Sequence, residues 1–253
     1  AVFNPQPAPG GLTGTAHDFG GGDLYQSVNL PAGNYTVVLQ WNDSIYSLGQ
    51  LPGAQHDLDI YLTDDAGNVL FGFNRENNWG DPIEVLPFTV AGSGQANIMI
   101  VKSWGAGNPE FKYIVFRGEM QILEYSSTGN STIVGQANAD GAMAVGAVLY
   151  TNTPAYGVNP PTPASFSSIG GAPVVGVTRM KPDFMAPNGI NTTVSLGGQN
   201  IDSDVFPNFF GTSASAPHAA AMAALVKDAR NKFYSMSMGP EEMRNLMRST
   251  AID

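Results

Sequence analysis

Apolar and polar residues alternate along the first half of the chain, between about residues 23 and 120. Residues 24–30 alternate in this way, and residues 35–41 are rich in β-branched and aromatic side chains. Similar segments follow at residues 58–62, 69–73, 83–90, 96–101 and 113–116. Short strands at this spacing, separated by turns of Gly, Pro, Asn and Asp, predict an all-β sandwich of the jelly-roll type.

After about residue 123 the pattern becomes that of an α/β fold. Residues 142–149 form a small, apolar run that is typical of a strand buried on both faces of a parallel sheet, and residues 174–177 predict another. Helices are predicted over residues 214–233 and 240–248. The first is rich in Ala, which predicts a central helix that its neighbours approach closely.

The composition is that of a well-packed globular protein. The 253 residues suffice for two domains, which we place at residues 1–123 (β-sandwich) and 124–253 (α/β). The net charge of -10 and the lack of a basic run exclude nucleic acid and anionic membranes as partners. The lack of Cys excludes disulfides and thiol nucleophiles, and no apolar run approaches the roughly 20 residues of a membrane span.

The candidate chemistry lies where a loop enters the long helix. Gly211 permits a tight turn, and Thr212 or Ser213 can supply the N-cap. Free N–H groups at a helix start stabilise a developing oxyanion, so a hydroxyl placed there can act as a nucleophile. For an isolated serine, a capping role on a buried helix is the more common explanation.

The whole segment 211–225 resembles the nucleophile motif of the subtilisin-like serine peptidases, Gly-Thr-Ser-x-[Ala/Ser]-x-Pro-His followed by a helix of small residues. Three further segments resemble the same family in the same order: residues 131–147, 166–189 and 240–253. The second of these carries Phe-Ser-Ser, Lys-Pro-Asp and Ala-Pro blocks, with Asn188 where the family usually has Gly. The resemblance implies one half of a subtilisin-like catalytic domain, with a parallel sheet and a central helix.

For the chemistry, the resemblance implies a secreted endopeptidase with protein or peptide substrates and no cofactor requirement. Ser213 would attack a peptide carbonyl and form an acyl-enzyme, and its backbone N–H would be one oxyanion donor. The other donor would be an Asn side chain. Three Ala-Gly-Asn tripeptides end at Asn34, Asn68 and Asn108, but turns explain all three, so we expect the family's Asn upstream.

The triad's Asp and His are missing from this chain. The family's Asp-[Ser/Thr]-Gly and His-Gly-Thr-His motifs do not occur. His17 and His56 lack that context, and His218 belongs to the serine motif, where a structural role is expected. We therefore predict that the upstream half of the catalytic domain supplies both residues and that this chain alone is inactive. A local dyad of Ser213 with one of the three histidines is an alternative that no spacing supports.

Residues 57–64, together with the turn that follows, resemble the Asp-Leu-Asp-Leu-Tyr-Leu core of the pre-peptidase C-terminal type of β-sandwich. Asp57, Asp59, Asp64 and Asp65 are therefore candidate ligands for a structural Ca²⁺. Aspartates on the solvent face of a strand, followed by a turn, explain the pattern without a metal. The sequence favours this second explanation because it lacks the spacing of a Ca²⁺ loop.

A non-catalytic role is the main alternative to the peptidase. The β-sandwich would then bind protein or glycan, with the α/β half as a scaffold. Trp79 and Trp104 are candidate residues of such a binding face. The presence or absence of the Asp and His motifs upstream distinguishes the two hypotheses.

Overall fold

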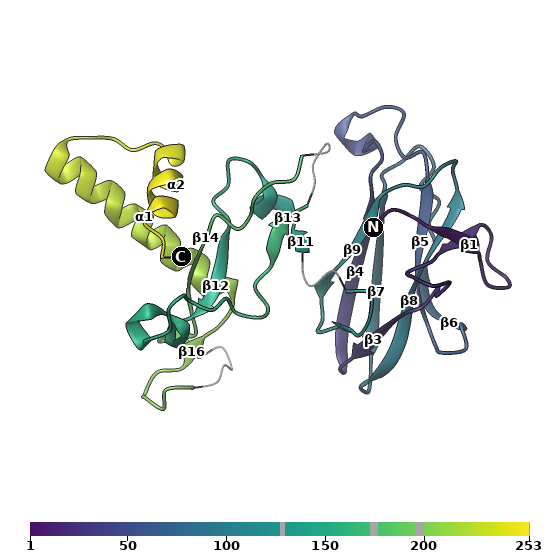
Figure 1. The fold of residues 1–253 in the computed structure, drawn as a ribbon, viewed down its shortest axis with the longest axis horizontal. Helices are drawn as coiled ribbons and strands as arrows, with labels where there is room; N and C mark the ends of the chain where they lie inside the picture. Colours follow the sequence, from purple (N-terminus) through teal and green to yellow (C-terminus); the bar gives the residue numbers. More distant parts are fainter. Residues whose placement is uncertain (127–129, 173–176, 196–199, 253) are drawn as a thin grey trace. The chain divides into compact units, whose positions relative to one another are not determined.

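The computed structural model describes residues 1–126, 130–172, 177–195 and 200–252. It divides into two compact units, Ala1–Ser127 (unit 1) and Thr128–Asp253 (unit 2), shown in Figure 1. The boundary falls a few residues beyond the change in sequence pattern. The strand predicted at residues 174–177 lies, apart from Val177, outside the described residues and stays a prediction.

The described part of unit 1 holds two antiparallel sheets. The larger has the strand order β1 (Pro5–Pro7), β2 (Thr15–His17), β8 (Gly94–Trp104), β3 (Gln26–Leu30) and β10 (Gln121–Ile122). In the same sheet β5 (Asp57–Thr63) pairs with both β8 and β6 (Val69–Phe73). The smaller sheet has the order β7 (Ile83–Val90), β4 (Gly33–Trp41) and β9 (Phe111–Arg117), and a 3-10 turn spans Tyr46–Leu48. These bounds confirm the seven strands that the alternation predicts.

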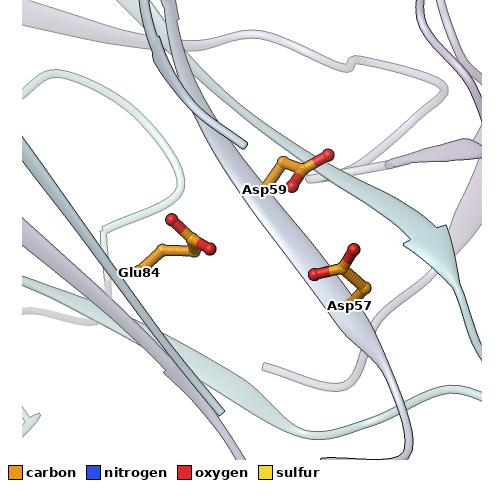
Figure 2. Close-up of side chains that lie close together, drawn as sticks. All are labelled: Asp57, Asp59 and Glu84. Atoms are coloured by element: carbon orange, nitrogen blue, oxygen red, sulfur yellow. The ribbon is translucent and has the colours of Figure 1, made fainter. Parts of the chain in front are cut away.

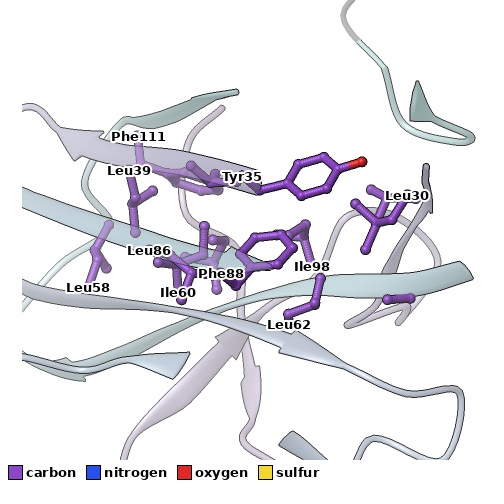
Figure 3. Close-up of a cluster of buried hydrophobic side chains, with 14 of the residues drawn as sticks. Leu30, Tyr35, Leu39, Leu58, Ile60, Leu62, Leu86, Phe88, Ile98 and Phe111 are labelled. Carbon is purple, nitrogen blue, oxygen red and sulfur yellow. The ribbon is translucent and has the colours of Figure 1, made fainter. Parts of the chain in front are cut away.

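Strand alternation explains the core between the two sheets (Figure 3). Tyr35, Val37 and Leu39 of β4 are buried at every second position. They join the buried side chains of the other strands in one cluster, in which the ring of Phe88 stacks on that of Tyr35 at 5.0 Å. Burial of this contiguous apolar surface is the main stabilising term for unit 1.

Strand β5 departs from the expected alternation because it is buried on both sides. Leu58, Ile60 and Leu62 face the core cluster, as the sequence predicts. Its other side is covered by a second cluster that contains Ala16, Tyr61, Met99 and Val101. Consequently all seven residues from Asp57 to Thr63 are buried. The prediction that the strand aspartates face solvent is therefore wrong.

The described part of unit 2 mixes parallel strands with helices, as expected of an α/β fold. Strand β12 (Val145–Leu149) pairs in parallel with β14 (Phe184–Asn188), and β11 (Asn130–Ile133) with β13 (Ile169–Gly171). Strands β15 (Ile190–Asn191) and β16 (Asn208–Phe209) form an antiparallel pair. Three 3-10 turns span Gly135–Asn138, Tyr150–Asn152 and Pro154–Tyr156.

Two helices complete unit 2 and confirm the predicted helical segments. Helix α1 (Thr212–Tyr234) packs against β12 and β14, and α2 (Pro240–Ser249) follows it (Figure 1). In α1 only Ala214, Ser215 and Ala219 are buried. The prediction of a central helix rather than a surface one is therefore wrong for the part of the chain that the structure describes, because the strands that contact α1 leave most of its surface exposed.

Candidate functional site

The loop that enters α1 turns sharply at Gly211, which is the N-cap residue. Its φ of 102° lies in the region that favours glycine. Because Gly211 makes the turn, the chain is already helical at Thr212, and no side chain caps the helix. The prediction that Thr212 or Ser213 supplies the N-cap is therefore wrong.

Ser213 stands in the first turn of α1 with its side chain exposed. The first backbone hydrogen bonds of the helix run from the N–H groups of Ala214 and Ser215 to the Gly211 carbonyl, at 3.0 and 3.3 Å. Within the described residues, neither the hydroxyl nor the N–H of Ser213 has a hydrogen-bond partner. A free hydroxyl therefore lies beside a free N–H at the positive end of a helix dipole, the arrangement that stabilises an oxyanion.

Asn188, at the end of β14, holds the loop that carries Ser213. Its side chain is 1% exposed, and its Oδ1 accepts a hydrogen bond from the Gly211 N–H at 3.4 Å. The next residue, Gly189, donates its N–H to the Phe209 carbonyl at 2.9 Å. The departure from the family's usual Gly at this position thus adds a side chain that contacts the backbone two residues before Ser213.

The sequence blocks that resemble the peptidase family meet in unit 2. Ile133, Gly146, Ser167, Pro182 and Thr212 line one cavity of about 230 Å³, although they are far apart along the chain. The Ser167 hydroxyl also accepts a hydrogen bond from the Ala147 N–H of β12 at 3.0 Å. The start of α1 therefore borders a recess built from several of these blocks.

The Lys-Pro-Asp block forms a buried ion pair. Lys181 Nζ donates to Asp183 Oδ2 at 2.8 Å and to the Ala142 carbonyl at 2.6 Å. The same carboxylate oxygen accepts the Ala144 N–H at 2.8 Å, and Arg244 Nε of α2 lies 3.7 Å from Asp183 Oδ1. This network joins the segment before β12, the segment before β14 and α2, so the block has a structural role.

The histidines of the chain are engaged in local contacts. Nδ1 of His17 accepts the Asn4 N–H at 2.9 Å. In His56, Nδ1 lies 3.1 Å from Asp43 and Nε2 lies 2.7 Å from the Ala106 carbonyl, so both nitrogens face acceptors. Nδ1 of His218 lies 3.2 Å from the carbonyl of Ala214, one helical turn earlier. His218 lies on the same helix as Ser213 and forms no hydrogen bond with it in the described structure.

The three Ala-Gly-Asn tripeptides all lie in unit 1, and Asn34, Asn68 and Asn108 are exposed. The Asn68 amide and backbone N–H both donate to Asp64, the latter at 2.8 Å, in the turn between β5 and β6. Asn34 instead lies within β4, where its Oδ1 accepts the Thr89 hydroxyl at 2.8 Å.

A second candidate site lies in unit 1, where carboxylates of Asp57, Asp59 and Glu84 come together (Figure 2). One oxygen of each lies within 4.8 Å of the others, and all three residues are buried. Asp64 does not belong to this group. Its carboxylate accepts hydrogen bonds within its own turn. Asp65 accepts a hydrogen bond from Asn97 at 3.2 Å.

Sequence reasoning missed Glu84, although the signal was available. In the predicted strand at residues 83–90, Glu84 alternates with Leu86 and Phe88 and so falls on their buried face. Burial, followed by the charges of Asp59 and Asp57, raises the pKa of Glu84 to about 8. Burial and then the Asp57 charge raise the pKa of Asp59 to about 7.

In the comparison with protein families, the model of the subtilase family (Peptidase_S8) matches residues 47–253. The match covers the whole of unit 2 and extends into unit 1, further than the resemblance that begins at residue 131. Comparison with curated proteins gives no match. Across the described ranges, neither α1 nor α2 has the length and apolar character needed to cross a membrane.

Proposed function

The chain belongs to the subtilase family, and on this premise we propose that it is part of a secreted serine endopeptidase whose nucleophile is Ser213. The observation that carries the proposal is the position of Ser213 in the first turn of α1. There an exposed hydroxyl lies beside an N–H that has no partner in the described structure. Peptide-bond hydrolysis needs both groups, one to attack and one to hold the oxyanion.

In this mechanism the Ser213 Oγ bonds to the carbonyl carbon of the substrate, while its proton passes to a histidine. The carbonyl oxygen becomes an oxyanion, which the Ser213 N–H and an Asn amide stabilise. The histidine then protonates the leaving amine, and the peptide C–N bond breaks to leave an acyl-enzyme. Water hydrolyses the acyl-enzyme and regenerates the serine, so the reaction needs no metal or organic cofactor.

The histidine and the aspartate that orients it would come from the upstream half of the catalytic domain. The exposed side of α1 supports this proposal. Met222, Leu225 and Phe233 are 56%, 71% and 71% exposed, and their helical spacing places them on one face. An apolar face on a helix rich in alanine fits a covering layer of further secondary structure. Unit 1 would then be a β-sandwich inserted into the catalytic domain.

The test is amidase activity of the protein extended upstream through the family's Asp and His motifs. We expect the extended protein to cleave peptide substrates, and Ser213→Ala to lower kcat by at least about 10³-fold. Ser215→Ala is the matched control, because the family motif accepts Ala or Ser at that position. Activity that survives Ser213→Ala, or a folded extended protein without activity, would contradict the proposal.

One observation favours a binding role for unit 1 as the second candidate function. The rings of Trp79 and Trp104 meet edge to face at 5.5 Å, and they are 53% and 39% exposed. Trp79 has a φ of 64°, an uncommon conformation for a bulky residue. Two adjacent exposed indoles suit a protein or glycan ligand. This role becomes the better account of the chain if the extended protein is inactive.

A further inference from the structure

The carboxylate cluster of unit 1 takes no part in the proposed chemistry of Ser213. Glu84 is its most unusual member, because the residue is 0% exposed and neither carboxylate oxygen has a hydrogen-bond partner in the described structure. Figure 2 shows its carboxylate directed toward β5, which carries the other two acids. A buried, unpaired carboxylate is costly, so the cluster requires protons or a cation for compensation.

Basic side chains do not supply that compensation. Among the described residues, neither Lys nor Arg forms an ion pair with Asp57, Asp59 or Glu84. The positive charge of Arg75 offsets only a smaller part of the rise in the pKa of Glu84. The cluster therefore concentrates three acidic groups without a matching protein cation.

The two aspartates are held in place by neighbouring donors. Oδ1 of Asp57 accepts the Asn77 N–H at 3.1 Å, and Oδ2 accepts the Ser103 hydroxyl at 2.8 Å. Oδ2 of Asp59 accepts the Tyr61 hydroxyl at 3.3 Å. Carboxylates that are oriented in this way by outer hydrogen bonds are typical of metal sites, where such bonds preorganise the ligands.

A cavity gives the two aspartates of the cluster access and room. It has a volume of about 260 Å³, and its lining includes Asp57, Asp59, Tyr61, Asn74, Glu76 and Ser103. These side chains offer oxygen atoms, and the space accommodates water molecules as further ligands. A cation that enters here meets both aspartates.

We propose that Asp57, Asp59 and Glu84 bind a Ca²⁺ ion. The ligands are all oxygen atoms, which hard cations prefer, and Ca²⁺ accepts six to eight of them at about 2.4 Å in flexible geometry. Two oxygens on opposite sides of such an ion lie about 4.8 Å apart, so the three carboxylates are close enough to share one ion. Mg²⁺ needs shorter distances and a near-ideal octahedron.

The site also has a structural consequence for the neighbouring loop. Asn77, whose N–H binds Asp57, donates its side-chain amide to the carbonyls of Asp81 and Ile83 at 2.7 and 3.0 Å. The same loop carries Trp79. Bound Ca²⁺ would therefore order the loop between β6 and β7, together with the exposed tryptophan.

The experiment is thermal unfolding of the chain, followed by tryptophan fluorescence, in EGTA and in 10 mM CaCl₂ or MgCl₂. All three tryptophans (Trp41, Trp79 and Trp104) lie in unit 1 and report its unfolding. We expect Ca²⁺ to raise Tm by about 5 °C or more, because it binds the folded state. We expect Mg²⁺ to have a smaller effect. An unchanged Tm in Ca²⁺, or equal shifts in both salts, would overturn the assignment.

Glu84→Gln and Asp64→Asn are the matched variants. Gln keeps the shape of Glu84 and removes its charge, so Glu84→Gln should stay folded in EGTA and lose the Ca²⁺ shift. Asp64→Asn changes a half-buried turn carboxylate outside the cluster and should keep the shift. A Ca²⁺ shift that persists in Glu84→Gln would overturn the proposal.

Two further measurements keep the test decisive. If Glu84→Gln does not fold, Tb³⁺ luminescence of the unaltered chain replaces the measurement on that variant. Tyr61 should sensitise this luminescence, and added Ca²⁺ should quench it. Absence of that luminescence would likewise refute the site. Ser213→Ala should retain the full Ca²⁺ response, so failure of the peptidase proposal and failure of the cation site are separately visible.

Discussion

At the scale of single residues, His17 shows how burial sets the chemistry of a side chain. The residue is 5% exposed, and the rings of Phe19 and Phe111 meet it edge-on, each at 4.8 Å. Burial lowers the pKa of His17 to about 4. The neutral ring accepts a hydrogen bond from Asn4, which a protonated Nδ1 could not do.

The lowered pKa predicts that the contribution of His17 to the stability of unit 1 depends on pH. Because the folded pKa lies below the ordinary value of 6.5, the unfolded state takes up the proton first as the pH falls. The stabilisation is complete above about pH 6.5 and is lost as the pH falls toward 4. This loss is on the order of 3 kcal/mol. Urea unfolding followed by tryptophan fluorescence measures this loss as the difference in pH dependence between the unaltered chain and a His17 variant.

The control for this prediction is the same titration on two variants. His17→Gln should lose less stability than the unaltered chain over this pH range, because the titrating group is gone. His218→Gln changes an exposed residue of unit 2 and should behave like the unaltered chain. Identical pH dependence of His17→Gln and the unaltered chain would refute the role of His17.

Sequence reasoning at this scale selected Ser213 as the candidate nucleophile because about eight neighbouring positions match the motif of the family. It failed for Asp57 and Asp59, because one strand does not reveal that a second cluster covers its other side. It did not place Glu84 beside these two aspartates, because they lie on a strand more than 20 residues earlier. Contacts between distant strands are a property of the fold and not of local spacing.

At the scale of elements, the buried ion pair of Lys181 and Asp183 belongs to a network that joins the segments before β12 and β14 to α2. Asp183→Asn leaves the Lys181 charge buried without its counterion, which costs about 3 kcal/mol or more. We expect faster hydrogen exchange in β12 and α2, which the network joins through Ala144 and Arg244. Exchange measured by mass spectrometry on peptides from these two elements tests this expectation.

Glu241→Gln is the control for that measurement. Its carboxylate also pairs with Arg244, at 2.9 Å, but its side chain is 68% exposed. Exposed pairs contribute little, so the change should stay within about 0.5 kcal/mol. Equal exchange in the Asp183→Asn and Glu241→Gln variants would show that the buried network does not stabilise the unit.

Element prediction succeeded where the pattern was long and failed where it was short. The alternation along β4 and β7 and the spacing in α2 each extend over at least eight residues. Strands β1 and β2 have three residues each, and two of the three in β1 are proline, which propensity assigns to edges and turns. Their strand conformation depends on pairing with each other and, for β2, with β8.

At the scale of the whole molecule, the exposed face of α1 is the feature that the upstream half should cover. Leu225→Glu places a charge on this face, so we expect labelling of Ser213 to fall at least about tenfold when the chain is mixed with its upstream half. Lys227→Glu, on the opposite side of the same helix, should have little effect. Equal loss in both variants would argue against a specific covering layer.

The overall organisation was predictable only in part. The change of pattern near residue 123 lies close to the boundary between the two units, and the motif blocks indicated the family that matches residues 47–253. The exposure of α1 was not predictable, because its Ala-rich sequence indicates only how closely neighbouring strands and helices can approach it. It does not report whether those neighbours lie within this chain.

The site of covalent labelling by a fluorophosphonate tests the role of Ser213 as nucleophile most directly. The protein extended through the Asp and His motifs is treated with the probe, digested and mapped by mass spectrometry. We expect stoichiometric modification of Ser213 and no modification in Ser213→Ala. Modification at another serine, or none in the folded extended protein, would contradict the assignment of Ser213 as the nucleophile.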